Sequence, residues 1–400
     1  MTDKFRMSTL SSIEAQCTRS GNVFKYVTIL IAFAALVGCT PHVTCTDIPH
    51  VLGGFHGGKR PWFTDMKCYC MPADGVEGDS IRFVRADTDD TKKPVFLFIQ
   101  GSLPMPTIVD YGQGLYDLGY DTHLYFREGP LLDSTLIADY HIVIVSQPYT
   151  PVIAPREKLG DYGAYYPNGT ENGFDRNYRL HHQAEIYTDR ICKVVDYLMT
   201  QDWVDKDSIY VYGHSQGAYI APLVAARNKH VAAIGISGLG PLGGTLTDVL
   251  ENRILALRGE ITEEEAWHRH LVEYSNWAYC RDSTDLATID KIKGDLPSTY
   301  LSYAHSHMEL LATLKQPVFC AYGTKDLHAI TCDWLPLYFI THHKTNYELI
   351  AYKGCGHNFE PLDNGATKSS ADHMSVWQGV TRSFVEFVRD MEHHRGVLAK

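Results

Sequence analysis

Several features that would point to other classes of protein are missing from this chain of 400 residues. No block of lysine and arginine stands out and the net charge is −11, so we expect no nucleic-acid partner. None of the 20 histidines lies in an H-E-x-x-H motif or in a Cys/His pattern with zinc spacing. No internal repeat or low-complexity tract is present. The sequence therefore favours a globular protein with no metal and no cofactor.

A long hydrophobic run is also missing. The apolar run from Val27 to Val37 is far shorter than the ~20 residues that span a bilayer, but it has the length of the hydrophobic region of a signal peptide. It leads into Leu36-Val37-Gly38-Cys39, which resembles a bacterial lipobox. That resemblance implies a signal peptide over residues 1–38, a lipid anchor on Cys39, and export to the cell envelope, on the periplasmic or outer surface. An ordinary cleaved signal and a signal anchor are the alternatives.

Export changes what is expected of the next segment and of the cysteines. Residues 39–64 follow the anchor and contain two glycine pairs, which predicts a tether. An oxidising compartment permits disulfides, but the sequence does not choose their pairing. Cys68 and Cys70 lie two apart on a predicted strand, face the same way and should not pair with each other.

Apolar runs predict the strands of a mostly parallel sheet. The first two form an antiparallel pair at an edge, and most of the later runs are continuous, which is typical of strands buried on both faces. Helical periodicity separates the later runs and marks a last helix from about Ser369 to His394. This alternation predicts a doubly wound α/β fold. The eight predicted strands are Asp65–Ala73, Ser80–Ala86, Pro94–Gly101, Tyr140–Gln147, Ser208–Gly213, His230–Ser237, Pro317–Gly323 and Tyr347–Tyr352.

Two long segments interrupt the alternation at the carboxyl ends of strands, where open α/β sheets bind ligands. Thr150 to Leu180 is rich in tyrosine, glycine and proline, and we expect an active-site loop with an aromatic pocket. Residues 245–314 are mostly helical, with a capping box at Thr262-x-x-Glu265, and predict a cap between core segments 65–244 and 315–400. The alternative is that these helices only pad the edge of the sheet.

The most informative motif is Gly213-His214-Ser215-Gln216-Gly217, between a predicted strand and a predicted helix. The two glycines allow a crowded, strained turn that lifts the Ser215 hydroxyl out of the sheet. The helix that follows offers backbone N–H groups to a developing oxyanion. Strand, turn and helix in this order predict a nucleophilic serine.

A nucleophilic serine needs a base and a carboxylate that orients the base. Asp326 follows the strand that ends at Gly323, and His357 lies on a glycine-rich loop after the next strand. Asp333 and His328 are the rival acid and base. The chain order Ser215, Asp326, His357 predicts a catalytic triad.

These motifs, together with Gln100-Gly101-Ser102, resemble those of the α/β-hydrolase-fold serine hydrolases, and the resemblance runs from about Asp65 to the C-terminus. It implies an eight-stranded, mostly parallel sheet flanked by helices, with a helical cap inserted after the sixth strand. It also implies an oxyanion hole made by the backbone N–H groups of Ser102 and Gln216.

The sequence therefore predicts an exported serine esterase, resembling a carboxylesterase, that cleaves a small-molecule acyl ester through an acyl-enzyme. A serine peptidase of the prolyl oligopeptidase type and a catalytically inactive ligand-binding lipoprotein are the alternatives. Acyl transfer to an alcohol also stays open, and the oligomeric state is not predicted.

Overall fold

The computed structural model describes residues 43–54, 62–73, 78–119, 138–282, 296–363, 366–367 and 370–398. All of them belong to one compact unit, Pro41–Lys400. The predicted signal peptide and Cys39 lie outside the described residues. Among the helices that are described, none has the length and apolar character needed to cross a membrane.

The strands are β1 (Thr44–Gly54), β2 (Trp62–Pro72), β3 (Ser80–Arg85), β4 (Lys93–Ile99), β5 (Ile108–Asp110), β6 (Tyr116–Leu118), β7 (His141–Val145), β8 (Ile153–Pro155), β9 (Val204–His214), β10 (Val231–Ser237), β11 (Val318–Gly323), β12 (Tyr347–Tyr352), β13 (Leu362–Asp363) and β14 (Ala366–Thr367). The α-helices are α3 (Arg176–His181), α4 (Ala184–Leu198), α5 (Gln216–Arg227), α6 (Gly244–Leu257), α7 (Glu263–Asp282), α8 (Pro297–Ser302), α9 (Met308–Thr313), α10 (Leu335–Thr341) and α11 (Ser370–Leu398).

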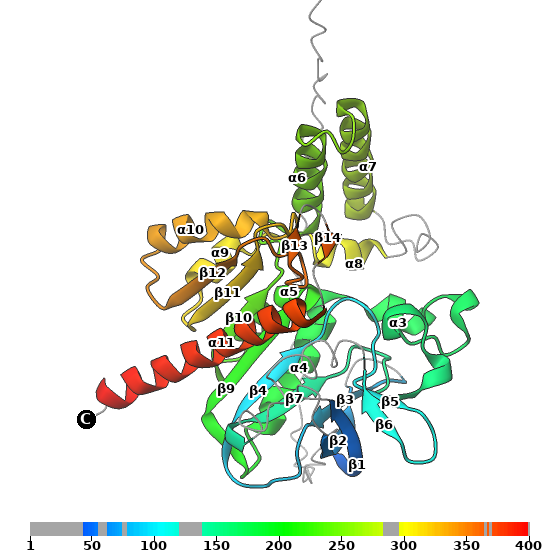
Figure 1. The fold of residues 1–400 in the computed structure, drawn as a ribbon, viewed down its shortest axis with the longest axis vertical. Helices are drawn as coiled ribbons and strands as arrows, with labels where there is room; N and C mark the ends of the chain where they lie inside the picture. The colour runs from blue at the N-terminus through cyan, green and yellow to red at the C-terminus, as the bar shows by residue number, and fades with distance from the viewer. Residues whose placement is uncertain are drawn as a thin grey trace, which may run out of the picture. The chain divides into compact units, whose positions relative to one another are not determined.

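Within the described residues the main sheet has twelve strands, in the order β12-β11-β10-β9-β4-β7-β3-β2-β1-β6-β5-β8 (Figure 1). The eight predicted strands correspond to β2, β3, β4, β7, β9, β10, β11 and β12. In the sheet they form one uninterrupted block, from β12 to β2. The predicted number of eight strands was too small. The extra strands β5, β6 and β8 have only three residues each, too short to give a hydrophobic pattern.

Six strands that are neighbours in the sheet run parallel to one another: β7, β4, β9, β10, β11 and β12. Strands β2 and β3 pair antiparallel, as predicted. The chain runs from β4 to β7 on one side and then crosses to β9 on the other side of β4. The order of strands therefore reverses between β4 and β9. A reversal of this kind opens a crevice at the carboxyl ends of the two strands.

The expected tether is wrong for residues 44–54, which form β1 and pair antiparallel with β2. The antiparallel pair β2–β3 is therefore not at the edge of the sheet. The glycines of this segment indicated a flexible linker, but Ile48 and Val51 are buried in one hydrophobic core with Met66 of β2. The burial of these apolar side chains against other strands outweighs the local preference of the glycines for a flexible linker.

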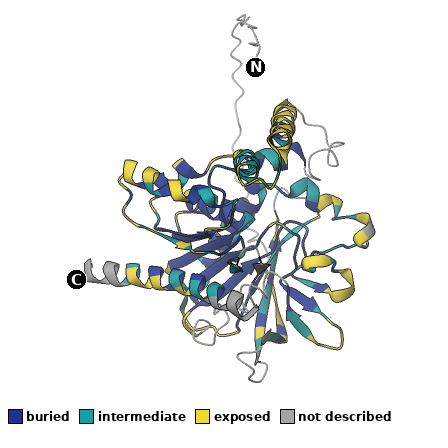
Figure 2. Ribbon diagram, turned by 45° about the horizontal axis from the view of Figure 1, so that its top comes forward, coloured by how far each residue is buried: buried dark blue, intermediate teal, exposed yellow. Residues whose placement is uncertain are grey.

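Two apolar cores lie on the two faces of the sheet. Along β4, Val95, Leu97 and Ile99 face the core that contains α4 and α5, whereas Phe96 and Phe98 face the core beneath α11. Both sets are fully buried, which explains why the strand reads as a continuous apolar run. Figure 2 shows that the strands in the middle of the sheet are mostly buried. The last predicted helix is present as α11.

The two long segments contain regular structure. Residues 150–180 contain β8, short 3-10 helices and α3. After β10, helices α6 and α7 pack against each other and stand away from the sheet (Figure 1). One of the two hydrogen bonds of the predicted capping box is present, from the Glu265 N–H to Thr262 Oγ1 at 3.1 Å, and the Glu265 carboxylate accepts from Arg269. Met308 and Leu311 of α9 are instead buried in the core with α5, so the last turns of this segment belong to the core.

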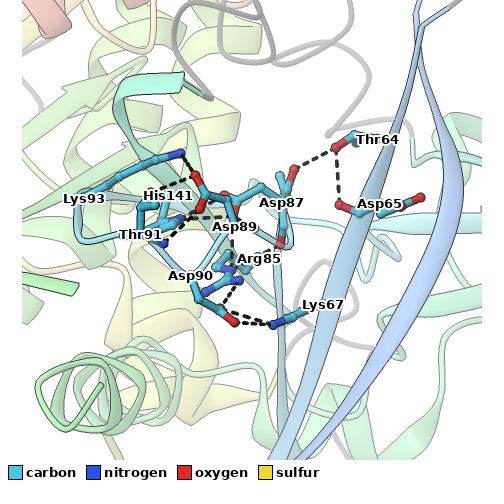
Figure 3. A network of polar contacts seen from close by, with 11 residues as sticks. Thr64, Asp65, Lys67, Arg85, Asp87, Asp89, Asp90, Thr91, Lys93 and His141 are labelled. Carbon is cyan, nitrogen blue, oxygen red and sulfur yellow. Dashed lines mark hydrogen bonds and ion pairs between the residues drawn. The ribbon is translucent and has the colours of Figure 1, made fainter. Parts of the chain in front are cut away.

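A buried polar network lies at the amino end of β4, opposite the crevice (Figure 3). Arg85 is fully buried and donates to Asp90 Oδ1 at 2.7 Å and to the Asp87 carbonyl oxygen at 3.2 Å. Its guanidinium lies 4.4 Å from the ring centre of Trp203, and His141 Nδ1 is 3.0 Å from Asp87 Oδ2. The network ties the end of β3, the start of β7 and the loop between β3 and β4.

Removing the buried cation should therefore cost more than removing an exposed one. Arg85→Met leaves Asp87 buried beside His141 without its arginine partner, and we expect a loss of about 3–5 kcal/mol in the free energy of unfolding. Arg227→Met is the matched control, since Arg227 donates to Asp189 at 2.8 Å with both side chains exposed, and should cost less than ~1 kcal/mol. Urea unfolding followed by circular dichroism measures both. Similar small losses would contradict a stabilising role for the network.

Candidate active site

Ser215 lies at a strained turn between β9 and α5. Its backbone has φ 55° and ψ −121°, a conformation that non-glycine residues rarely adopt. A Cβ atom on Gly213 would lie 2.0 Å from the Gly217 carbonyl oxygen, and one on Gly217 would lie 2.3 Å from the Ile99 carbonyl oxygen. Only glycine fits at either position, so the sequence motif and the observed turn have the same physical cause.

The loops after β11 and β12 are joined by backbone contacts. The Lys325 N–H donates to the Cys355 carbonyl oxygen at 2.8 Å, and the Thr324 N–H donates to the Tyr352 carbonyl oxygen at 3.1 Å. A Cβ atom on Gly323 would lie 2.3 Å from the Cys355 carbonyl oxygen. Because the loops pack this closely, the residues that follow, Asp326 and His357, are held near each other.

Ser215, His357 and Asp326 form one hydrogen-bonded line. His357 Nε2 lies 3.0 Å from Ser215 Oγ, and His357 Nδ1 lies 2.8 Å from Asp326 Oδ2. The other oxygen of Asp326 accepts the His328 N–H at 3.0 Å, which fixes the carboxylate. The three residues of the predicted triad are therefore brought together from three separate loops.

The rival acid and base lie elsewhere. Asp333 accepts a hydrogen bond from the Tyr322 hydroxyl and lies in the 3-10 helix Ile330–Trp334, after the Asp326 loop. The His328 ring lies edge-on to His357 with 6.1 Å between ring centres, and its Nε2 is 3.1 Å from the Tyr219 hydroxyl. Neither residue has a hydrogen bond to Ser215 in the described structure.

The surroundings shift the pKa values of three neighbouring histidines in different directions. Burial lowers the pKa of His214 and of His328, with a further lowering by His357. Burial also disfavours the charged form of His357, but its hydrogen bond with Asp326 and the charge of that carboxylate outweigh burial and raise the pKa of His357. His357 alone is both hydrogen-bonded to Ser215 and stabilised as a cation.

His214, the residue before the nucleophile, is buried directly beside His357, with 5.1 Å between ring centres. Its Nδ1 is 2.8 Å from Ser237 Oγ, and its Nε2 is 3.1 Å from Asn358 Oδ1. Because Asn358 accepts through its carbonyl oxygen, His214 donates through Nε2. His214 therefore supports the loop that carries His357. No pattern along the chain marks this contact, apart from the adjacency of Asn358 and His357.

The predicted oxyanion donors lie on neighbouring strand ends. Ile99 of β4 is paired with Gly213 of β9, so the residues that follow them leave the sheet side by side. Ser102 follows β4, and its carbonyl oxygen accepts the Tyr178 hydroxyl at 2.8 Å. Gln216 begins α5, where backbone N–H groups have no partner inside the helix. Its side-chain Oε1 is 3.0 Å from His182 Nε2.

Tyr178 comes from the segment Thr150 to Leu180, which was expected to form an aromatic pocket, and no motif pointed to His182. Tyr178 is buried, and both residues contact the segments that carry the predicted oxyanion donors.

In the described part of the chain, no group of three or more histidine, cysteine or acidic side chains is placed to hold a metal ion. The described cysteines have free thiols, including Cys68 and Cys70.

A mostly parallel sheet, a strained serine turn beside the strand reversal, and a Ser–His–Asp line from three strand ends define an α/β-hydrolase-fold serine hydrolase. The model of the prolyl oligopeptidase family matches residues 168–374, just over half of the chain. The chain belongs to this family. No curated protein sequence matches it.

Solved structures of several hydrolases are similar in fold. A candidate dipeptidyl aminopeptidase IV of Bacteroides ovatus is 12% identical over 88% of this chain and 36% of its own, with a TM-score of 0.41. A candidate lipase of Acinetobacter baumannii is 13% identical over 82% and 93% of the two chains, with a TM-score of 0.43. Acetyl xylan esterase 1 of Thermoanaerobacterium is 14% identical over 79% and 83%, with a TM-score of 0.39. This chain thus spans about a third of the length of the first of these proteins.

The raised pKa of His357 predicts how hydrolysis should depend on pH. A general base acts in its neutral form, so kcat/KM should fall as the pH drops through a pKa above the ordinary histidine value of 6.5. Asp326→Asn removes the charge that raises this pKa, and should move the acid limb to lower pH and lower kcat about 10⁴-fold. Asp333→Asn is the control and should leave the limb in place. An acid limb that Asp326→Asn leaves unmoved would contradict the assignment of His357 as the titrating base.

Proposed function

We propose that this protein hydrolyses an acyl ester through a covalent intermediate on Ser215. The observation that carries the proposal is the line from Asp326 through His357 to Ser215, with distances of 2.8 and 3.0 Å. These distances are within the range for transfer of a proton from the serine to the imidazole. Asp326 is almost fully buried, which suits a carboxylate that orients an imidazole and stabilises its cation.

Each step follows from these residues. His357 Nε2 accepts the proton of Ser215 as Oγ attacks the carbonyl carbon, and the carbonyl oxygen becomes an oxyanion. The backbone N–H groups of Ser102 and Gln216 bind that oxyanion, each lowering the barrier by about 3 kcal/mol. His357 then protonates the leaving oxygen, and the acyl group stays on Ser215. Finally His357 takes a proton from water, the hydroxyl attacks the acyl carbon, and Ser215 recovers its proton.

A peptide bond is the second candidate substrate, because the chain belongs to the prolyl oligopeptidase family. The same residues can cleave an amide if His357 protonates a leaving amine. Two substrates with the same acyl group, a nitrophenyl ester and a nitroanilide, compare the two bonds directly. A glycyl-prolyl nitroanilide tests whether the protein cleaves a peptide substrate. Turnover of that peptide at a kcat/KM equal to or above that of the esters would replace the ester proposal with the peptidase one.

The role of Ser215 has a direct test. Ser215→Ala removes the nucleophile and should lower ester kcat by about 10⁵-fold or more, and should also abolish labelling by a fluorophosphonate. Ser275→Ala on the exposed face of α7 is the control and should leave both readouts unchanged. Fluorophosphonate labelling that survives Ser215→Ala would show that another serine reacts. A wild-type protein that neither reacts nor turns over esters would favour the ligand-binding lipoprotein.

We also propose that the protein is exported and anchored to the cell envelope through a lipid on Cys39. The support comes from the sequence alone, namely the apolar run Val27 to Val37 followed by Leu36-Val37-Gly38-Cys39. An acyl chain on the new N-terminus would hold the hydrolase at a membrane surface. The substrate would then be met outside the cytoplasm.

The anchor can be tested with the full chain produced in a bacterium. Cys39→Ser should remove incorporation of labelled palmitate and should move the protein from the membrane fraction to the soluble fraction. Cys45→Ser, an exposed cysteine six positions along the chain, is the control and should keep both properties. Label that stays on the Cys39→Ser variant, or is absent from wild type, would contradict the anchor.

A further inference from the structure

The loop that carries Ser102 is held by two side chains from other parts of the fold. The Gln147 side-chain amide donates to the Gly101 carbonyl oxygen, and the Tyr178 hydroxyl donates to the Ser102 carbonyl oxygen at 2.8 Å. The Gly101 carbonyl and the Ser102 N–H belong to the same planar peptide group and point in opposite directions. Fixing that carbonyl therefore fixes the direction of the Ser102 N–H.

Tyr178 is itself held in place. The Asp175 side chain accepts the N–H groups of Asn177 and Tyr178 at the start of α3, and Tyr178 is buried. Its ring stacks on His182 with 4.8 Å between ring centres, and His182 Nε2 is hydrogen-bonded to the Gln216 side chain. The segment 175–182 therefore contacts both residues whose N–H groups are the proposed oxyanion donors.

Gln147 is anchored from the opposite side. It lies two residues after the end of β7, is fully buried, and its backbone carbonyl lies 3.4 Å from Arg190 Nη2. Arg190 is buried too, and donates to Asp79 Oδ2 at 2.6 Å and to the Ser80 carbonyl oxygen at 2.9 Å. An ion pair between α4 and the residues at the start of β3 thus supports the strand end from which Gln147 reaches Gly101.

The hydrogen bond from Gln147 to Gly101 lies in buried surroundings. A buried carbonyl that loses its donor bears the cost of its desolvation without compensation. Gly101 also has no side chain to restrain its peptide, so the loop depends on outside contacts to keep one conformation.

We propose that Gln147 and Tyr178 are positioning residues that hold the Ser102 N–H toward the oxyanion. The proposal rests on the proposed function, because it assumes that Ser102 is an oxyanion donor. An N–H that is oriented before reaction stabilises the transition state without reorganisation. Charge develops on the carbonyl oxygen only in the transition state, so loss of this orientation should lower kcat and leave KM almost unchanged.

Tyr178→Phe removes one hydroxyl and keeps the ring that stacks on His182. We expect kcat for a nitrophenyl ester to fall about 10- to 100-fold, with KM within about twofold of wild type. Tyr187→Phe is the matched control, because the Tyr187 hydroxyl is also buried and donates to a backbone carbonyl, that of Val145, at 3.1 Å. It should keep kcat within about twofold. Equal losses in the two variants would overturn the proposal.

Gln147→Met gives a second and independent variant. A trifluoromethyl ketone with the acyl group of the ester forms a tetrahedral adduct on Ser215, so its inhibition constant reports oxyanion binding. This constant should rise in parallel with the loss of kcat/KM in Gln147→Met and in Tyr178→Phe. The acid limb of the pH profile should stay in place, because His357 and Asp326 keep their contacts.

The possible failures can be told apart. If Ser215→Ala abolishes turnover while both variants keep the wild-type kcat and inhibition constant, the positioning roles are wrong and the proposed function stands. If ester turnover survives Ser215→Ala, the proposed function fails and the positioning roles fail with it. A variant with lower kcat and an unchanged inhibition constant would also overturn the positioning role.

Discussion

The contact between the Ser215 turn and the end of β4 sets the geometry of the whole site. Gly217 approaches the Ile99 carbonyl so closely that a Cβ atom would lie 2.3 Å from the oxygen. This contact brings the first turn of α5 against the loop that carries Ser102, and the pairing of Ile99 with Gly213 keeps the two strand ends level. The nucleophile and both proposed donors therefore share one short stretch of sheet edge. The loops of Asp326 and His357 reach the same edge from β11 and β12, so a shift of the serine turn would separate the serine from its base and from the donors.

Burial disfavours the charged forms of His214 and His357 alike, and the carboxylate beside His357 makes the difference between them. The pKa of His214 is lowered, so this residue stays neutral and serves as a hydrogen-bonding support between Ser237 and Asn358. The pKa of His357 is raised because the carboxylate of Asp326 stabilises its charge. A third of the His357 side-chain surface (33%) remains exposed, whereas Asp326 keeps 4%. The base is thus open to a substrate, while the acid that orients it is shielded from water.

The sequence predicted most of the sheet and the Ser–His–Asp line because both depend on local signals. Continuous apolar runs mark β4, β7 and β9, and glycines mark the turns at Ser215 and before Asp326 and His357. Strands β5, β6 and β8 are too short for such a pattern, and β1 was hidden by its glycines. The contact of Tyr178 with Ser102 joins residues 76 positions apart, and no periodicity relates them. The role of His182 was missed for the same reason, since only the folded chain brings it to Gln216.

The helices between β10 and β11 supply none of the three residues of the Ser–His–Asp line and neither side chain that holds the Ser102 loop. Helices α6 and α7 pack on each other, whereas the side chains that hold the Ser102 loop come from residues 147 and 178, which precede β9. The anchorage of Gln147 and Tyr178 therefore does not depend on the α6–α7 hairpin. For protein engineering the hairpin is a natural insertion site, because its length can change while these two side chains keep their hydrogen bonds.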